Sequence, residues 1–311
     1  MSIDLTNPIF HDDAAARAHL EAQRWPNGPI CAHCGERHAD KITKLEGKAH
    51  RAGLYQCKTC REQFSVTVGT VFERSKVPLA KWVLATHLMA ASKKGMSAKQ
   101  IERMLGVTYK TAWFMMHRIR EAMSPSATDT SPIGGTDKIV ESDETFVGGK
   151  AKNAKRFKPV PKKYPVVALI ERGGPMRAKH VADVTGKNVR KALVTNVSRK
   201  SMLMTDDAAV YERIGKEFYA HGKVNHSAGQ YADEIGFKHI NTCESYFALL
   251  KRGIMGSFHS VSEAHLQRYA DEFAFRWNHR KTDDAERANA ILKAAEGKRL
   301  TYRRSGEAGH A

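Results

Sequence analysis

The spacing of hydrophobic positions changes twice along the chain. Residues 14–24 are rich in helix formers, and short alternating runs typical of β-strands follow up to about residue 72. Between residues 78 and 123 apolar side chains recur every three or four positions, which predicts three short helices. From residue 139 onward strand-like runs alternate with amphipathic segments, so the second half is expected to mix strands and helices.

The three helices predicted between residues 78 and 123 have the pattern of a helix-turn-helix unit. Ser97 and Gln100 have the spacing of a capping box that starts the second helix, and Gly106 lies in the turn before the third. In such a unit the helix after the turn enters the major groove of DNA. Four side chains on or near that helix are predicted to contact DNA: Tyr109, Lys110, Arg118 and Arg120. A three-helix linker bundle is the alternative.

The second half of the chain predicts a mixed sheet flanked by helices. Strands are expected over residues 139–147, 164–170, 177–184, 202–205 and 223–226. Helices are expected around residues 189–197 and 208–218, and again from residue 244. This order, with acidic residues on the first strand, the fourth strand and a late helix, is the ribonuclease-H-like arrangement.

Four of the five cysteines form two pairs, each with two residues between its members: Cys31 with Cys34, and Cys57 with Cys60. Two such pairs separated by 22 residues can supply four thiolates to one tetrahedral Zn²⁺. Either His33 or His38 could replace one thiolate, although four paired cysteines make this unnecessary. The pattern predicts a structural zinc ribbon.

These patterns together predict a multi-domain α+β chain with a small zinc ribbon, a helix-turn-helix bundle and a ribonuclease-H-like mixed-sheet α/β catalytic core. The expected segments are a helical lead-in over 1–28, the ribbon over 29–75, the helix-turn-helix over 76–124, a linker over 125–138, the core over 139–280, and a C-terminal helix and basic tail over 281–311.

The charge balance narrows the choice of partner. The chain has 51 Lys and Arg residues against 33 Asp and Glu, a net charge of +18. Such an excess attracts polyanions, of which nucleic acid is the commonest and an anionic membrane surface the competing possibility. No apolar run approaches the roughly 20 residues of a membrane span, and the N-terminus lacks the pattern of a signal peptide. A soluble cytoplasmic protein that does not bind membranes is expected.

Three carboxylates stand where a two-metal phosphoryl-transfer site needs them. Asp143 lies in the first predicted strand of the sheet, Asp206 follows the fourth, and Glu244 opens the late helix. Mg²⁺ takes oxygen ligands, and two such ions about 3.5–4 Å apart can bind both the attacking and the leaving oxygen of a displaced phosphate. Two Mg²⁺ or Mn²⁺ ions are therefore the predicted cofactors of this site.

Each carboxylate also has a purely structural interpretation. Asp143 could be a solvated residue at a strand end, and Asp206 could cap the helix that follows it. Asn241 and Glu244 match the spacing of a capping box, in which Glu244 would bind a backbone N–H. Against this, Lys251 lies two helical turns beyond Glu244 on the same face, where it could bind a phosphate beside the metals.

A basic segment follows the first predicted strand of the core. Residues 148–163 contain seven Lys and Arg residues, of which Lys150, Lys155 and Arg156 are predicted to contact nucleic acid. Basic loops are often merely solvated, but this one begins directly after a candidate catalytic strand.

The motifs together resemble those of the ISXO-like bacterial insertion-sequence transposases, which join a zinc ribbon to an integrase-type DDE core. The resemblance covers about residues 25–280. It is carried by the two cysteine pairs with the run to residue 72, and by the segments 141–149, 205–206, 224–227, 241–252, 265–269 and 275–280. Asp207 departs from the family, in which an acidic and an aromatic residue (Glu-Trp) more typically occur at this point, and residues 231–240 also differ from the expected form.

The resemblance implies cleavage and strand transfer of double-stranded DNA at the terminal inverted repeats of an insertion sequence. It implies that Asp143, Asp206 and Glu244 bind the catalytic metals and that Lys251 belongs to the same motif. Joining two element ends to target DNA implies a homodimer or larger assembly on DNA, associated with the bacterial nucleoid.

Two other functions remain open at this stage. A non-catalytic DNA-binding regulator derived from a transposase would bind the repeats without needing Asp143. A ribonuclease-H-like nuclease would cut nucleic acid without joining it. The attached recognition modules favour site-specific transposition over a general nuclease.

Overall fold

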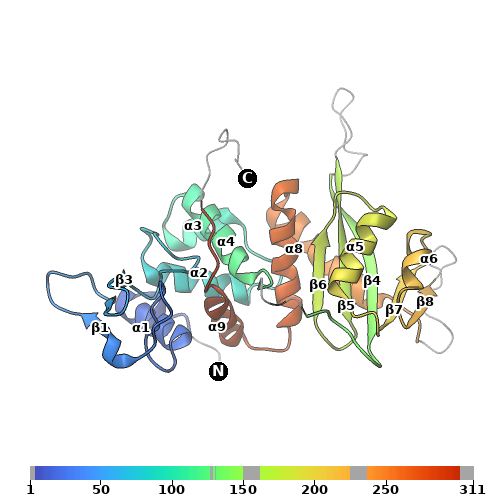
Figure 1. The fold of residues 1–311 in the computed structure, drawn as a ribbon. Coiled ribbons are helices and arrows are strands. Elements are labelled where there is room, and N and C mark those ends of the chain that lie inside the picture. Colours follow the sequence, from blue (N-terminus) through green and yellow to red (C-terminus); the bar gives the residue numbers. More distant parts are fainter. Residues whose placement is uncertain (1–3, 127–128, 130, 150–161, 225–236, 302–311) are drawn as a thin grey trace. The chain divides into compact units, whose positions relative to one another are not determined.

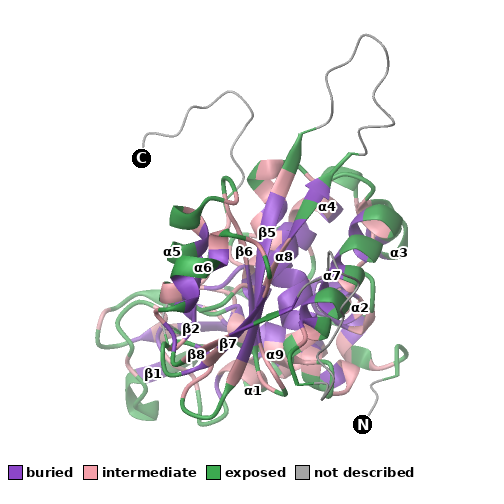
Figure 2. Ribbon diagram, turned by 90° about the vertical axis from the view of Figure 1, so that its right-hand side faces the viewer, coloured by how far each residue is buried: buried purple, intermediate pink, exposed green. Residues whose placement is uncertain are grey.

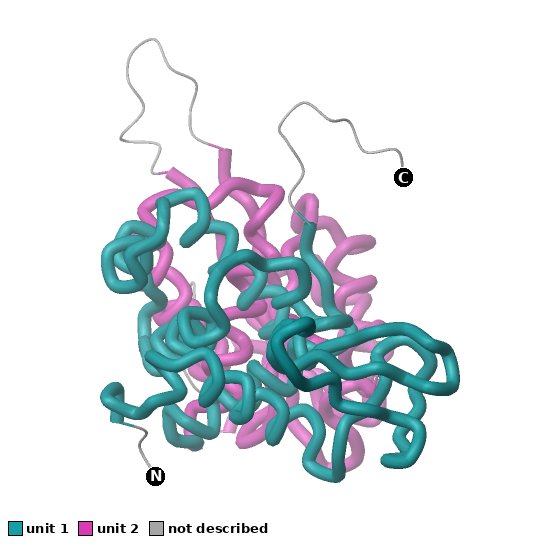
Figure 3. The backbone as a smooth tube through the Cα atoms, turned by 90° about the vertical axis from the view of Figure 1, so that its left-hand side faces the viewer, with its two compact units in different colours: residues 1–123, 282–311 teal, residues 124–281 magenta. Residues whose placement is uncertain are grey.

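The computed structural model describes residues 4–126, 129, 131–149, 162–224 and 237–301 (Figure 1). The chain forms two compact units (Figure 3). Unit 1 consists of Met1–Met123 with Thr282–Ala311, and unit 2 of Ser124–Lys281. The C-terminal segment thus belongs to the same compact unit as the cysteine pairs and the helices that follow them.

Unit 1 begins with a helix and a small antiparallel sheet. These elements are α1 (Asp13–Arg24), β1 (Ile42–Leu45), β2 (Leu54–Cys57) and β3 (Gln63–Phe64), with short 3₁₀ turns at Pro8–Phe10 and Ala39–Lys41. The strands pair in the order β1-β2-β3. The rings of Trp25, Tyr55 and Phe64 pack together with centroids 5.5–5.8 Å apart. This aromatic cluster gives the small sheet a hydrophobic core of its own.

Four helices complete unit 1: α2 (Leu79–Ala91), α3 (Ala98–Leu105), α4 (Tyr109–Met123) and α9 (Asp284–Ala294). The first three lie where the apolar periodicity predicted helices. The Ser97 hydroxyl caps α3 by accepting from the N–H of Gln100 (3.2 Å), and Gly106 ends it in the left-handed conformation (φ 59°). Helix α9 packs against α2 and α4 and starts with a capping box between Asp283 and Glu286.

Unit 2 is built on a five-stranded mixed sheet, as predicted. Its strands are β4 (Ile139–Gly148), β5 (Lys163–Glu171), β6 (Met176–His180), β7 (Met202–Asp206) and β8 (Ala220–Val224), in the order β6-β5-β4-β7-β8. Strands β4, β5 and β6 form an antiparallel meander, whereas β7 runs parallel to β4 and β8 parallel to β7. The first strand of the unit is therefore the central strand of the sheet.

The helices of unit 2 cover both faces of this sheet. They are α5 (Gly186–Asn196), α6 (Val210–Gly215), α7 (Asn241–Gly253), followed by a π-helical turn at Ile254–Phe258, and α8 (Glu263–Asn278). Apolar residues of β5 and β6 pack on one face with α7 and α8, and Val140 and Leu203 pack on the other face with α5 and α6. Figure 2 shows buried residues along the central strands. Because side chains alternate along a strand, odd positions of β4 and even positions of β7 face α7.

Helix α8, which was not predicted as an element, closes one edge of the sheet. Its Gln267 amide accepts from the N–H of His180 (2.8 Å) and donates to the carbonyl of Ala178 (2.9 Å). In the same way, the Asn278 amide accepts from the N–H of Met176 (2.9 Å) and donates to its carbonyl (3.1 Å). Two side-chain amides therefore satisfy backbone groups of edge strand β6 that would otherwise be open to pairing.

Across the part of the chain that the structure describes, no helix is both long enough and apolar enough to cross a membrane.

Candidate active site

Four thiols of unit 1 lie together: those of Cys31, Cys34, Cys57 and Cys60. Their Sγ atoms are all within 4.8 Å of one another, and among the described residues no other set of three or more His, Cys, Asp or Glu side chains meets this criterion. Sγ of Cys31 is 3.6 Å from that of Cys60, and Sγ of Cys34 is 3.7 Å from that of Cys57. Thiolates at about 2.3 Å from one tetrahedral Zn²⁺ would be about 3.8 Å apart. The cluster fits the predicted structural zinc.

The two cysteine pairs repeat one backbone geometry. The N–H of Cys31 donates to the carbonyl five residues further on (2.8 Å), and the N–H of Cys57 does the same (3.0 Å). The residue after each pair has a positive φ, 77° and 63° respectively. His33 is exposed and lies 3.3 Å from a backbone carbonyl, and neither it nor His38 belongs to the thiol cluster. The two pairs thus form matching knuckles, and no histidine replaces a thiolate.

In unit 2, the three predicted carboxylates come from three neighbouring elements. Asp143 lies in β4, Asp206 ends β7, and Glu244 lies in the first turn of α7. The ladder between β4 and β7 ends with the pair Glu141 and Met204, and each aspartate lies two residues further along its strand. Both aspartates are therefore on the face of the sheet that α7 covers.

Burial and neighbouring negative charges both act on the pKa of Asp143. Burial raises its pKa from 3.8 to about 7, and the negative charges of Glu144, Asp206 and Glu244 add to the increase. A hydrogen bond from the backbone N–H of Glu144 (2.8 Å) opposes it. Carboxylates that repel one another in a largely buried position are stabilised when a cation lies among them.

Glu144, the neighbour of Asp143, points to the opposite face of the sheet. Its carboxylate accepts a 2.6 Å hydrogen bond from the hydroxyl of the buried Tyr211 in α6. Burial raises the pKa of Glu144, the Tyr211 bond lowers it, and the charge of Asp206 raises it again. Glu144 and Tyr211 were not predicted as site residues; the only sequence signal was the crowding of acids around Asp143.

Helix α7 begins at Asn241, and Ile240, the residue preceding it, makes no side-chain cap bond. The backbone N–H of Glu244 donates to the carbonyl of Ile240 (3.2 Å). The buried carboxylate of Glu141 accepts from the backbone N–H groups of Thr242 (2.9 Å) and Cys243 (3.3 Å). A carboxylate of the sheet therefore caps the first turn of α7.

Asp206 partly fits the alternative role of capping the helix that follows it. Its Oδ1 accepts from the N–H of Ala208 (3.1 Å) in the turn that leads to α6, which begins only at Val210. Lys251 lies two turns beyond Glu244 in α7 and is exposed.

Comparison with known proteins places this arrangement in a family. The family model of the ISXO2-like transposase domain matches residues 134–278, and that of the transposase zinc-ribbon domain matches residues 11–63. Together the two matches cover more than half of the chain. The chain belongs to the ISXO2-like transposases. The first match contains all three carboxylates, and the second contains all four cysteines.

This ISXO2-like transposase is also similar to a protein in transposable element ISH50 of Halobacterium salinarum. The two are 28% identical over 295 residues, which cover 89% of this chain and 95% of the relative. The similarity therefore extends over both units, and not only over the segments that match the family models.

Of the residues predicted to contact DNA in this transposase, some are exposed and others are buried. Tyr109 and Lys110, the first two residues of α4, are exposed. Arg118, in contrast, is 9% exposed, and its guanidinium donates to the backbone carbonyls of Glu73 and Leu300 (both 3.1 Å). Its donors serve to hold segments of unit 1 together.

Arg118 also stacks near the rings of Phe114 (5.0 Å) and Trp82 (6.0 Å), and Arg120 is 1% exposed. Burial of both side chains is incompatible with direct contact to DNA, so this part of the prediction is corrected. Their charge was visible in the sequence, but the helix face on which they lie was not. The predicted contacts Lys150, Lys155 and Arg156 fall outside the described residues.

Proposed function

We propose that this transposase cleaves DNA at the terminal inverted repeats of an insertion sequence and joins the freed 3′ end to target DNA, in a metal-dependent reaction. The observation that carries the proposal is the placement of Asp143 and Asp206 on the face of the sheet that α7 covers, with Glu244 in the first turn of α7. Burial raises the pKa of Asp143, and the charges of Glu144, Asp206 and Glu244 add to the increase. A site of this kind is costly for a protein unless it binds cations.

The donor set of the site suits hard divalent cations. Asp143, Asp206 and Glu244 offer only carboxylate oxygens, the ligands that Mg²⁺ and Mn²⁺ prefer. Two such ions held there would supply an activated oxygen nucleophile and neutralise charge on the leaving oxygen. The protein's own contribution is to carry the carboxylates on two adjacent strands and one helix, which limits their movement.

The strand order supports a ribonuclease-H-like core. An antiparallel meander, β4-β5-β6, is followed by β7 and β8, which run parallel to β4 on its other side. In this arrangement Asp143 is on the central strand and Asp206 on the strand beside it. The candidate site thus lies where the first and fourth strands are neighbours.

Lys251 is proposed to bind a phosphate of the DNA. It is exposed and lies on α7 two turns beyond Glu244, at a spacing that keeps both side chains on one face of the helix. A fixed ammonium group there would balance negative charge that develops on the phosphate during transfer.

Recognition of the element ends is assigned to unit 1. The left-handed Gly106 ends α3 immediately before α4, and the exposed Tyr109 and Lys110 stand at the start of α4, where a recognition helix contacts base edges. The net charge of +18 would add a salt-dependent attraction to phosphates. Joining two ends calls for at least a dimer on DNA, associated with the nucleoid in a bacterial cytoplasm.

A cleavage and joining assay tests this proposal. The purified protein would be incubated with Mg²⁺ and a labelled duplex that carries the element end, beside Asp143→Asn and the control Asp183→Asn, which makes the same change in the exposed turn before α5. Nicked and joined products that vanish only in Asp143→Asn would support transposition. Nicking without joining would indicate a nuclease, and binding without chemistry a regulator.

A further inference from the structure

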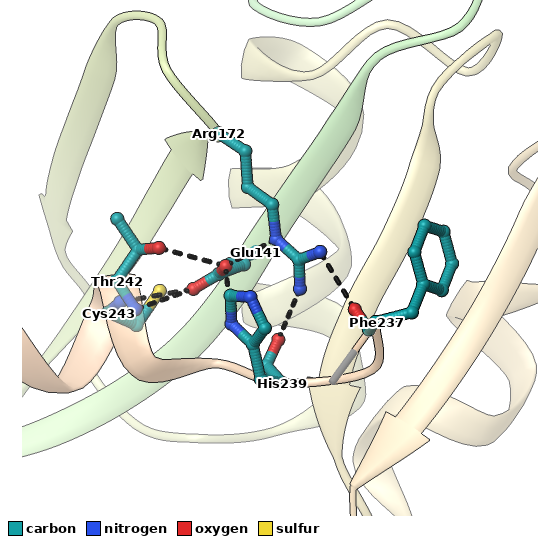
Figure 4. A network of polar contacts seen from close by, with 6 residues as sticks. All are labelled: Glu141, Arg172, Phe237, His239, Thr242 and Cys243. Carbon is teal, nitrogen blue, oxygen red and sulfur yellow. Dashed lines mark hydrogen bonds and ion pairs between the residues drawn. The ribbon is translucent and has the colours of Figure 1, made fainter. Parts of the chain in front are cut away.

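The buried carboxylate of Glu141 collects hydrogen bonds from two separate parts of unit 2 (Figure 4). Its Oε2 accepts from the backbone N–H groups of Thr242 (2.9 Å) and Cys243 (3.3 Å). Its Oε1 accepts from the Thr242 hydroxyl (2.9 Å) and from Nε of Arg172 (2.6 Å). Glu141 has no exposed surface, so its carboxylate depends on these partners in place of water.

Arg172 extends this network to the segment that leads into α7. Its Nη1 donates to the carbonyl of Phe237 and its Nη2 to the carbonyl of His239, both at 2.8 Å. Its own backbone N–H bonds to the carbonyl of Ile139 at the start of β4 (3.0 Å). One guanidinium therefore ties β4 to the residues just before α7, in addition to neutralising Glu141.

We propose that Glu141 and Arg172 are positioning residues that hold the first turn of α7 against β4 and thereby set the place of Glu244 relative to Asp143. This inference rests on the function proposed above, because it assigns a task to that same site. Glu141 lies two residues before Asp143 on the same face of the strand, and Cys243 directly precedes Glu244. The path between the two candidate metal ligands is thus one short run of strand, one hydrogen-bonded contact and one peptide bond.

The chemistry of the contact explains why a carboxylate is needed. The first N–H groups of a helix have no partner within the helix, and the helix dipole favours a negative charge beside them. A buried negative charge is costly unless a cation compensates it, which Arg172 does. Since both oxygens of Glu141 face N–H or O–H donors, an amide in its place would direct its own N–H₂ group toward another donor.

His239 is the remaining neighbour of the carboxylate. Its Nδ1 lies 3.2 Å from Oε1 of Glu141, but the two atoms are not aligned for a hydrogen bond. The hydrogen bonds of the Glu141 carboxylate are therefore those from Arg172, from the Thr242 hydroxyl and from the backbone of the first turn of α7.

Hydrogen exchange tests the contact without requiring activity. In Glu141→Gln and Arg172→Lys, the amides of Thr242 and Cys243 should exchange at least tenfold faster than in the wild type. Glu217→Gln is the matched control, because it removes a carboxylate that forms an exposed bidentate pair with Arg190 (2.6 and 2.8 Å). Unchanged exchange in both variants would overturn the proposal. If Glu141→Gln does not fold, the result for Arg172→Lys tests the proposal by itself. This variant keeps the positive charge and loses only hydrogen-bond donors of the guanidinium.

Kinetics then test the consequence for the site. With DNA bound, Glu141→Gln should lower kcat for cleavage by 10- to 100-fold, as expected for a misplaced ligand, while KM and DNA affinity stay within twofold of the wild type. Faster exchange with wild-type kcat would show a structural contact without a positioning role and would refute the inference. If the wild type itself cleaves no DNA, the proposed function fails, whereas the exchange result still judges the contact.

Discussion

Asp143 and Asp206 occupy matching positions on neighbouring parallel strands, each two residues beyond the last pair of the ladder between β4 and β7. Their side chains share the face of the sheet that α7 covers. Burial raises the pKa of Asp143, and the charge of Asp206 adds to the increase. Without a cation this arrangement works against folding whenever both groups are ionised. The site therefore makes predictions about stability as well as activity.

Asp143→Asn should stabilise the protein at pH 8 in buffer without added divalent ions. The pKa of Asp143 is about 7 in the folded chain, against an ordinary value of 3.8. Between pH 3.8 and pH 7, Asp143 is therefore protonated in the folded chain and ionised in the unfolded chain. Its contribution to stability is therefore lost as pH rises through this window. The variant should be roughly 4 kcal/mol more stable at pH 8 and nearly equal to the wild type near pH 4, as measured by urea unfolding.

Asp183→Asn should change the free energy of unfolding in the opposite direction in the same experiment. The side-chain hydrogen bond from Thr185 and the one from Asn188 lower the pKa of Asp183, so this change should weaken the protein at pH 8. No gain for Asp143→Asn at pH 8 would contradict the raised pKa of Asp143. An equal gain for Asp183→Asn would show that the effect is not specific to the candidate site.

Mg²⁺ should stabilise the wild type more at pH 8 than at pH 5. Ionised carboxylates bind the metal, and protonation of Asp143 below its pKa of about 7 competes with it. At a hundredfold excess over its dissociation constant, a ligand adds about 2.7 kcal/mol to the free energy of unfolding. Thermal unfolding at both pH values, with and without Mg²⁺, measures the difference. An equal response in Asp143→Asn would place the bound Mg²⁺ elsewhere.

Cys57→Ser should remove zinc and unfold the ribbon. Structural Zn²⁺ contributes about 10–16 kcal/mol in small domains, more than a sheet of three short strands can replace. The zinc content, measured by atomic absorption, should fall from about one ion per chain to almost none. His33→Ala should keep its zinc, and loss of the metal in that variant would contradict a site of four thiolates.

Arg118→Ala and Lys110→Ala should separate stability from DNA binding. Arg118→Ala removes buried hydrogen bonds to the carbonyls of Glu73 and Leu300, so it should cost roughly 2–4 kcal/mol in unfolding free energy. Lys110→Ala should leave stability within about 0.5 kcal/mol and reduce the salt dependence of DNA affinity by about one phosphate contact. The reverse pattern would restore Arg118 as a DNA contact.

Short-range patterns in the sequence predicted the parts of the structure that depend on neighbouring residues. Two cysteine pairs at the right spacing were enough for the thiol cluster, and the alternation of apolar residues was enough for the mixed sheet. The sequence also indicated which strands carry Asp143 and Asp206, because each follows a recognisable apolar run.

Contacts between distant segments could not be predicted in this way. Glu141 caps a helix that begins a hundred residues later, whereas the spacing of Asn241 and Glu244 pointed only to a local cap as an alternative. Arg118 and Arg120 looked like DNA contacts because charge is visible in a sequence, whereas the face that a helix buries depends on its partners. For the same reason nothing in the sequence revealed that Gln267 covers a sheet edge.

The claim that Asp143 binds a catalytic metal is tested most directly by Asp143→Cys in the strand-joining assay. A thiolate is a softer ligand than a carboxylate and suits Mn²⁺ better than Mg²⁺. Asp143→Cys is expected to form no joined product with Mg²⁺ and to recover part of the activity with Mn²⁺, while Asp183→Cys should behave like the wild type with both ions. Joining at the wild-type rate by Asp143→Cys in Mg²⁺ would contradict the claim.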